Sequence, residues 1–159
     1  FKGFLYAGLM IVDNEPFLIE YNVRMGDPEC QTILPRLKTN FADIISACVN
    51  EDLKSIDIKW HEEKSICIVL CSKGYPDKYK NNVEIKELDK LTIKKNDFIF
   101  HAGTKINDSK IYSNGGRVLN FVIRSKNLKE SRNHAINLIN RLDWDNGYFR
   151  KDIGFKIID

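Results

Sequence analysis

The chain contains the stretch FLIEYNVRMGDPE at residues 17–29, and its expected fold is organised around this stretch. Residues 17–24 have the pattern of a β-strand, in which successive side chains point to opposite faces. That alternation places four side chains on one face, namely Leu18, Glu20, Asn22 and Arg24. Residues 26–29 then turn the chain into a helix, for which Asp27 is the expected N-cap and Pro28 the first helical residue.

The polar side chains of this strand suggest a site for a divalent cation and the phosphates that it binds. The carboxylate of Glu20 and the amide oxygen of Asn22 are hard oxygen ligands of the kind that Mg²⁺ prefers, and Mg²⁺ usually takes water and substrate phosphates as its other ligands. The guanidinium of Arg24 suits a phosphate group. The alternative is a solvent-facing polar row on an edge strand, with Arg24 as an ordinary surface arginine.

Length and composition describe an ordinary globular protein. The 159 residues can bury one core or two small ones. Hydrophobic residues make up 43% and charged residues 30%, as is usual for soluble proteins. No apolar run is long enough for a membrane span, and no secretory signal is visible, so we expect a cytoplasmic protein without a membrane partner. The net charge of +3 is spread along the chain, which argues against nucleic acid as a partner.

The first part of the chain predicts a β-hairpin followed by two helices. A buried strand at residues 4–12 and the strand at 17–24 are joined by a turn. One helix should run from about residue 27 to residue 37, with a kink or an early end at Pro35. A second helix at residues 41–49 has Asn40 as its N-cap.

The second part is richer in strands. We expect strands at residues 65–72, 97–105, 110–113 and 117–124 and a helix at 128–142. We therefore predict an α+β fold in two domains, residues 1–60 and 61–159. The first combines an antiparallel hairpin with helices, and the second is a small antiparallel sheet with one packed helix. A two-stranded hairpin is too small to stand alone, so the first domain needs further strands.

Two glycine-containing turns in the second part are candidates for binding an anion. After a buried strand, Gly74 permits close backbone approach, and Lys73 suits a phosphate. Further along, the backbone amides of Gly115 and Gly116 suit an anion, with Arg117 beside them. The first segment is more often only a strand-ending turn, and the second has the composition of a hairpin turn.

Five segments, in order and at suitable spacing, together resemble the glycinamide ribonucleotide synthetase family. Residues 2–37 resemble the C-terminal part of its ATP-grasp domain, whose Glu-x-Asn-x-Arg pattern many ATP-grasp enzymes share. Four further segments resemble the signatures of its C-terminal domain: SKGYP at 72–76, FHAGT at 100–104, NGGRVL at 114–119 and RKDIG at 150–154.

The resemblance implies an ATP-dependent ligase of purine biosynthesis that joins glycine to 5-phosphoribosylamine through glycyl phosphate. ATP would be a substrate, and Mg²⁺ or Mn²⁺ the metal. Glu20 and Asn22 would bind the metal, and Arg24 would bind ATP and stabilise the phosphoryl group during transfer. Asp27 would hold the ammonium of glycine or order the turn. The remaining residues expected to bind substrate are Lys73, Gly74, Gly115, Gly116 and Arg117.

The family enzyme also has an N-terminal domain, an ATP lid and a strand that holds adenine, and none of these has a counterpart here. We therefore expect a monomeric C-terminal fragment that is inactive without the missing N-terminal part of the enzyme. Two alternatives remain. The chain could be a stand-alone, non-catalytic module that binds nucleotide and metal, or it could belong to another ATP-grasp ligase.

Overall fold

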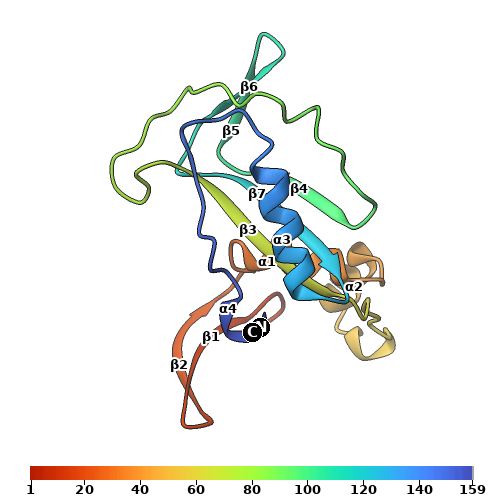
Figure 1. The fold of residues 1–159 in the computed structure, drawn as a ribbon. Coiled ribbons are helices and arrows are strands. Elements are labelled where there is room, and N and C mark those ends of the chain that lie inside the picture. The colour runs from red at the N-terminus through yellow and green to blue at the C-terminus, as the bar shows by residue number, and fades with distance from the viewer. Residues whose placement is uncertain (159) are drawn as a thin grey trace. The chain divides into compact units, whose positions relative to one another are not determined.

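The computed structural model describes residues 1–158, so Asp159, the last residue of the expected second domain, lies outside it. The chain divides after His61 into two compact units, the first ending at His61 and the second beginning at Glu62. Figure 1 shows their elements. None of the helices within the described residues is both long and apolar enough to cross a membrane.

The first unit begins with an antiparallel hairpin of β1 (Tyr6–Val12) and β2 (Glu15–Asn22). Its turn residues Asp13 and Asn14 have φ angles of 51° and 65°, as the tightest hairpin turns require. Four short helical elements complete the unit: α1 (Glu29–Ile33), a 3-10 turn (Leu34–Arg36), α2 (Phe41–Val49) and a second 3-10 turn (Leu53–Ser55).

The hairpin exposes apolar side chains on both of its faces. Leu9 and Ile11 of β1 are 52% and 60% exposed, and Ile19 of β2 is 63% exposed. Within the described residues, β1 and β2 form a sheet of their own with no third strand. The prediction of a buried first strand is therefore wrong, because its large apolar side chains are exposed and it has no partner strand other than β2 within residues 1–158.

The helices of the first unit follow the sequence patterns only in part. The expected helix at 27–37 is reduced to α1, because Pro35 has no N–H for an α-helical ladder and lies in the 3-10 turn. Asp27 is not the N-cap, which is Pro28; instead its Oδ1 accepts a hydrogen bond from Gln31 Nε2 at 2.9 Å. The prediction for α2 is confirmed, with Asn40 Oδ1 accepting from the Ala42 amide at 2.9 Å.

An apolar cavity of about 360 Å³ lies within the first unit. One face of α2 lines it through Phe41, Ile44, Ile45 and Cys48. Phe4 stacks on Phe41 with 5.7 Å between ring centroids. The small core of this unit is therefore only partly filled by its own side chains.

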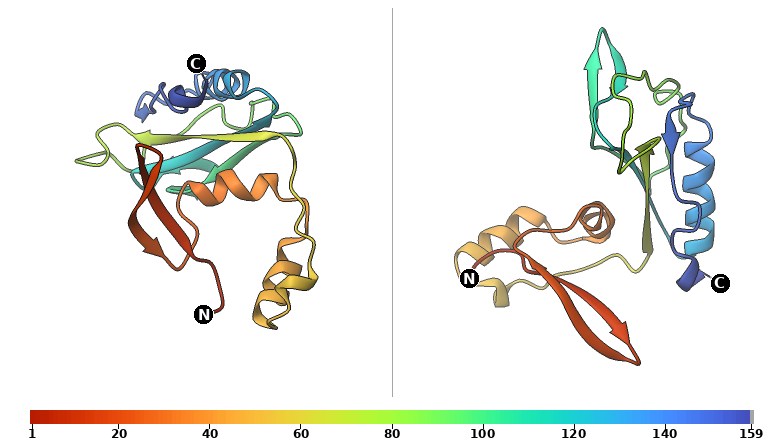
Figure 2. Two further views of the ribbon diagram at one scale, coloured as in Figure 1. Left: turned by 90° about the horizontal axis from the view of Figure 1, so that it is seen from below. Right: turned by 90° about the vertical axis from the view of Figure 1, so that its left-hand side faces the viewer.

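The second unit is built on a four-stranded antiparallel sheet in the order β4-β7-β3-β8. Its strands are β3 (Lys64–Ser72), β4 (Asp97–His101), β7 (Arg117–Ser125) and β8 (Gly147–Tyr148). The single long helix, α3 (Leu128–Ile139), lies along one face of this sheet (Figure 2). A separate hairpin of β5 (Thr104–Asn107) and β6 (Lys110–Ser113) and a final helical turn, α4 (Phe155–Ile158), complete the unit. The predicted α+β class is confirmed.

The core of the second unit is made by paired residues of β3 and β7 under α3. Three cross-strand pairs lie side by side: Ile66 with Ile123, Ile68 with Phe121, and Leu70 with Leu119. All six side chains belong to one buried cluster, together with Ala135, Leu138 and Ile139 of α3. Since cross-strand neighbours are the unit of sheet stabilisation, this ladder fixes the register of the two longest strands.

Two details of the second unit differ from expectation. The strand predicted at 97–105 is divided, because β4 ends at His101 and the chain bends before β5. The helix predicted to reach residue 142 ends at Ile139. The connection between β3 and β4 contributes Ile85 and Leu91 to the buried core.

The cap of α3 gives a test of this fold. Asn127 Oδ1 accepts hydrogen bonds from the amides of Lys129 at 2.9 Å and Glu130 at 3.2 Å. Asn127→Ala removes the acceptor of both hydrogen bonds, and we expect it to lower the free energy of unfolding by about 1 kcal/mol in urea denaturation. Lys129→Ala, an exposed change on the same turn, should stay within about 0.5 kcal/mol of wild type. Equal effects of the two variants would contradict the cap.

Candidate functional site

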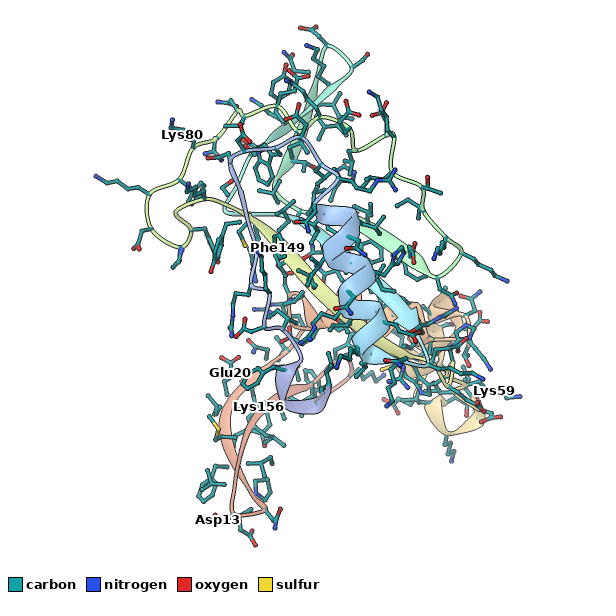
Figure 3. The ribbon with its side chains drawn as sticks, viewed as in Figure 1. Asp13, Glu20, Lys59, Lys80, Phe149 and Lys156 are labelled. Carbon is teal, nitrogen blue, oxygen red and sulfur yellow. The ribbon has the colours of Figure 1, made fainter. Side chains whose placement is uncertain are left out.

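The carboxylate and amide predicted to bind a metal lie together at the end of β2. Glu20 pairs with Gly8 of β1 and Asn22 pairs with Tyr6, so the two side chains share one face of the hairpin. Asn22 Nδ2 donates a hydrogen bond to Glu20 Oε1 at 3.0 Å. That bond uses the amide nitrogen of Asn22 and one oxygen of Glu20, so it leaves the amide oxygen of Asn22 and the second carboxylate oxygen of Glu20 to other ligands (Figure 3 labels Glu20 on β2).

The rest of the predicted polar row is not on this face. Gly8 pairs with Glu20 but Leu9 pairs with Leu18, so Ile19 is an extra residue and the alternation is reset there. Leu18 is therefore on the face opposite Glu20. Arg24 lies beyond the end of β2, where its Nη1 donates to the carbonyl of Met25 at 3.0 Å. The expected row of four side chains is corrected to the Glu20–Asn22 pair, with Arg24 two residues past the strand.

The Glu20–Asn22 pair suits a cation that takes few ligands from the protein. No group of three or more His, Cys, Asp and Glu side chains within residues 1–158 could hold a metal ion. The residue facing Glu20 is Gly8, where an added Cβ would lie 3.1 Å from Glu20 Cγ, so glycine leaves room for this side chain. One carboxylate and one amide oxygen fit Mg²⁺, which fills its other positions with water and phosphate oxygens.

In the second unit, the two glycine-containing turns meet at the end of β3. The amide of Ser72 donates to the carbonyl of Gly116 at 2.7 Å, and Ser72 Oγ donates to the carbonyl of Gly115 at 2.8 Å. Ser72 is fully buried. Its hydroxyl therefore ties the Lys73–Gly74 turn to the turn that precedes Arg117.

One more of the resembling segments, residues 100–104, joins them. The Gly103 amide donates to the carbonyl of Arg117 at 2.9 Å, and the Asn114 amide donates to the carbonyl of Gly103 at 2.7 Å. On the other side of β3, Ser72 pairs with Gly147 of β8, the strand that leads into residues 150–154. Three of the four segments that resemble the C-terminal domain are thus gathered at one end of the sheet, around the predicted substrate-binding residues Lys73, Gly74, Gly115, Gly116 and Arg117. Residues 150–154 lead away from that end, since Gly154 lies beside Ile66 at the start of β3.

Glycine is needed at two of these positions for reasons of space. Gly74 has a φ of +100°, and a Cβ there would overlap the carbonyl oxygen of Lys78. A Cβ at Gly116 would overlap the ring of Tyr75. The sequence analysis assigned no role to Tyr75 or Ser72, because no local pattern shows which distant residues they contact.

Two side chains in or beside these segments have shifted pKa values. Burial raises the pKa of the Cys71 thiol, and the Arg117 guanidinium, on the residue paired with Cys71, opposes that rise. In the tail, Arg150 binds Asp152 through two hydrogen bonds, of 3.0 Å from Nε and 2.7 Å from Nη2. That bidentate contact lowers the pKa of Asp152.

Comparison with known proteins accounts for both units. Residues 65–156 match the family described as phosphoribosylglycinamide synthetase, C domain, and residues 1–30 match its ATP-grasp (A) domain. The chain belongs to the phosphoribosylglycinamide synthetase family. The predicted family resemblance is confirmed.

Relatives of this synthetase family occur in bacteria and plants. The chain is 43% identical over 153 residues to the phosphoribosylamine–glycine ligase of Caldanaerobacter subterraneus subsp. tengcongensis and 41% identical over 155 residues to that of Fusobacterium nucleatum subsp. nucleatum. A crystal structure of phosphoribosylamine–glycine ligase from Thermotoga maritima matches with a TM-score of 0.76, at 31% identity and over 93% of this chain.

The match covers nearly all of this chain but only part of each relative. It takes in 96% of this chain but 36% of the length of the Caldanaerobacter relative, and 36% of the Thermotoga chain. The chain therefore spans little more than a third of the length of the relatives that it matches.

The contact between Cys71 and Arg117 can be tested by thiol chemistry. Only the thiolate reacts with iodoacetamide, and Arg117 favours the thiolate of Cys71. Arg117→Gln should therefore slow alkylation of Cys71 at pH 8 by about two- to threefold, as read from the Cys71 peptide by mass spectrometry. Arg117→Lys keeps the charge and should restore most of the rate. An unchanged rate in Arg117→Gln would show that the charge does not act on Cys71.

The packing of Tyr75 over Gly116 gives a double-mutant cycle. Gly116→Ala puts a methyl group where the Tyr75 ring lies, so it should lower the free energy of unfolding by about 1–3 kcal/mol. In a Tyr75→Ala background the same substitution should cost little, because the ring is absent. The coupling free energy from chemical denaturation measures this contact. Additive effects would mean that the ring does not lie over Gly116.

Proposed function

We propose that this chain is the C-terminal part of a phosphoribosylamine–glycine ligase, which uses ATP to join glycine to 5-phosphoribosylamine. The observation on which the proposal rests is the Glu20–Asn22 pair at the end of β2, in a chain whose curated relatives are named as this ligase. The division after His61 supports assigning residues 1–60 to the end of an ATP-grasp domain and residues 61–159 to the C-terminal synthetase domain.

The first chemical step is phosphoryl transfer. A carboxylate oxygen of glycine attacks the γ-phosphorus of ATP, the bond to the bridging oxygen breaks, and ADP leaves glycyl phosphate behind. Two anions must approach each other, so the site has to offset negative charge. Glu20 and Asn22 would hold a divalent cation, which supplies positive charge to the phosphate oxygens. Arg24 would bind the same phosphates, and Asp27 would accept hydrogen bonds from the ammonium of glycine.

The second step forms the amide. The amine nitrogen of 5-phosphoribosylamine attacks the acyl carbon of glycyl phosphate, the carbon–oxygen bond to phosphate breaks, and the nitrogen loses a proton. The turns at the end of β3 would position the phosphoribosylamine, through Lys73 and Arg117 as cations and through the backbone at Gly74, Gly115 and Gly116. The gathering of these turns around Ser72 supports this role.

Several finer points belong to the same proposal. Hard oxygen ligands favour Mg²⁺, with Mn²⁺ as a substitute. The ligase would work as a cytoplasmic monomer on small-molecule substrates, with no nucleic acid or membrane as a partner. The 159 residues would act joined to the N-terminal region that the longer relatives contain.

The test is glycine ligation by the complete ligase that contains this chain, with and without Glu20→Ala. Loss of the metal-binding carboxylate should lower kcat at least about 100-fold, because charge stabilisation of the transition state is lost. The free energy of unfolding should change by less than about 1 kcal/mol, since Glu20 is exposed.

Glu15→Ala on the same strand is the matched control and should keep near wild-type activity. A Glu20→Ala enzyme with wild-type turnover would refute the metal assignment. A wild-type enzyme that uses another amine or another carboxylic acid in place of these substrates would show that it is a different ATP-grasp ligase.

A further inference from the structure

Two asparagines of the second unit are followed by a glycine. Asn114–Gly115 lies in the turn between β6 and β7, and Asn146–Gly147 lies at the start of β8. Asparagine is a thermolabile residue, and a following glycine makes it more so, because glycine has no Cβ to shield its backbone nitrogen. We propose that Asn114 is a site of spontaneous deamidation and that the fold protects Asn146. Only the effect on ligation rests on the proposed function.

The reaction takes place within the chain and needs only water as a co-reactant. The backbone nitrogen of Gly115 bonds to Cγ of Asn114 and gives up its proton, and Nδ2 leaves with a proton as ammonia. The product is a cyclic imide. Water then breaks one of the two bonds from the imide nitrogen to carbon. Cleavage at Cγ gives aspartate, and cleavage at the main-chain carbonyl gives isoaspartate, in which the main chain runs through the former side chain.

The contacts of the β6–β7 turn leave both reacting groups free. Asn114 is exposed, and within residues 1–158 neither its side-chain amide nor the N–H of Gly115 takes part in a hydrogen bond. The turn is held through other atoms: the Asn114 amide donates to the carbonyl of Gly103 at 2.7 Å, and Ser72 Oγ donates to the carbonyl of Gly115 at 2.8 Å. A Cβ at Gly103 would lie 3.1 Å from the nitrogen of Gly115, so glycine at position 103 also leaves that nitrogen uncovered.

The corresponding groups at Asn146 are all held by hydrogen bonds. Asn146 Nδ2 donates to the carbonyl of Lys80 at 3.4 Å, and the carbonyl of Asn146 accepts from the Lys73 amide at 2.7 Å. The nitrogen that would attack, that of Gly147, donates to the carbonyl of Trp144 at 3.0 Å. Asn146 is also only partly exposed. Ring closure at Asn146 therefore requires a local opening first, and ring closure at Asn114 breaks no hydrogen bond of the reacting groups.

Deamidation of Asn114 changes the turn that is proposed to bind substrate. Either product places a carboxylate three residues before Arg117, so negative charge is added beside a cation proposed to attract an anionic substrate. Isoaspartate also lengthens the main chain by a methylene group. The turn has little room for it, since a Cβ at Gly115 would lie 3.1 Å from Cα of Gly103. Displacement of Gly115 breaks its bond to Ser72, and we expect ligation to slow as Asn114 is converted.

The modification is tested by incubating the folded 159-residue chain in mildly alkaline buffer, which favours loss of the glycine amide proton. Mass spectrometry of peptides then measures aspartate and isoaspartate at both positions. Asn114 should be converted at least about tenfold faster than Asn146, because hydrogen bonds must open before Asn146 reacts. In denaturing urea the two positions should react at similar rates, since the local sequence is the same. Equal rates in the folded chain, or conversion of Asn114 in urea alone, would overturn the proposal.

Two substitutions at residue 114 test the effect on ligation by the complete ligase. Asn114→Gln closes the ring much more slowly, so it should retain its own starting activity during an incubation in which the wild type loses activity as Asn114 is converted. Asn114→Asp reproduces the added charge and should lower kcat/KM for 5-phosphoribosylamine at least about threefold. A wild-type ligase with Asn114 converted and activity intact would overturn the effect on ligation.

The outcome is separable from that of the ligase assay. A complete protein that does not ligate glycine but is deamidated at Asn114 would refute the proposed function and keep this inference. An active ligase in which Asn114 stays intact while Asn146 is converted would refute the inference and keep the function.

Discussion

The second unit depends on the pairing of β3 with β7. Three apolar pairs under α3, with Ile68 and Phe121 at their centre, determine how the two strands align. Because side chains alternate with a period of two, a slip of one residue would turn these pairs away from the helix. The same slip would separate Ser72 from Gly115 and Gly116. A single register therefore builds both the core and the gathering of turns proposed to bind substrate.

What the sequence predicts well is local. Period-two alternation shows that Glu20 and Asn22 share a face, and the Asn40 cap marks the start of α2. The errors arise at the helix cap and in the strand alternation, where the structure departs from the simple local pattern. Pro28 takes the cap position expected for Asp27, and Leu18 changes face because the register shifts at Ile19.

The contacts between distant turns could not be predicted from local patterns. No periodicity in the sequence shows that Ser72 bonds to Gly115 or that Lys73 bonds to Asn146. Family resemblance indicated that these segments matter, but not how they touch. Tyr75 illustrates the difference. Its place over Gly116 follows from the β3–β7 register and from the bend after Gly74, and both are properties of the folded chain.

The position of β7 has a consequence for the motions of the chain. Both edges of β7 are hydrogen-bonded, to β3 and to β4, whereas each strand of the β1–β2 hairpin has one edge without a partner strand in the described residues. Amide protons exchange with solvent through openings whose cost follows local packing and pairing. Amides of β7 such as that of Phe121 should exchange only with global unfolding of the second unit, and those of the hairpin should exchange through local fraying. Deuterium uptake should thus be slowest in β7 and fastest in the β1–β2 hairpin.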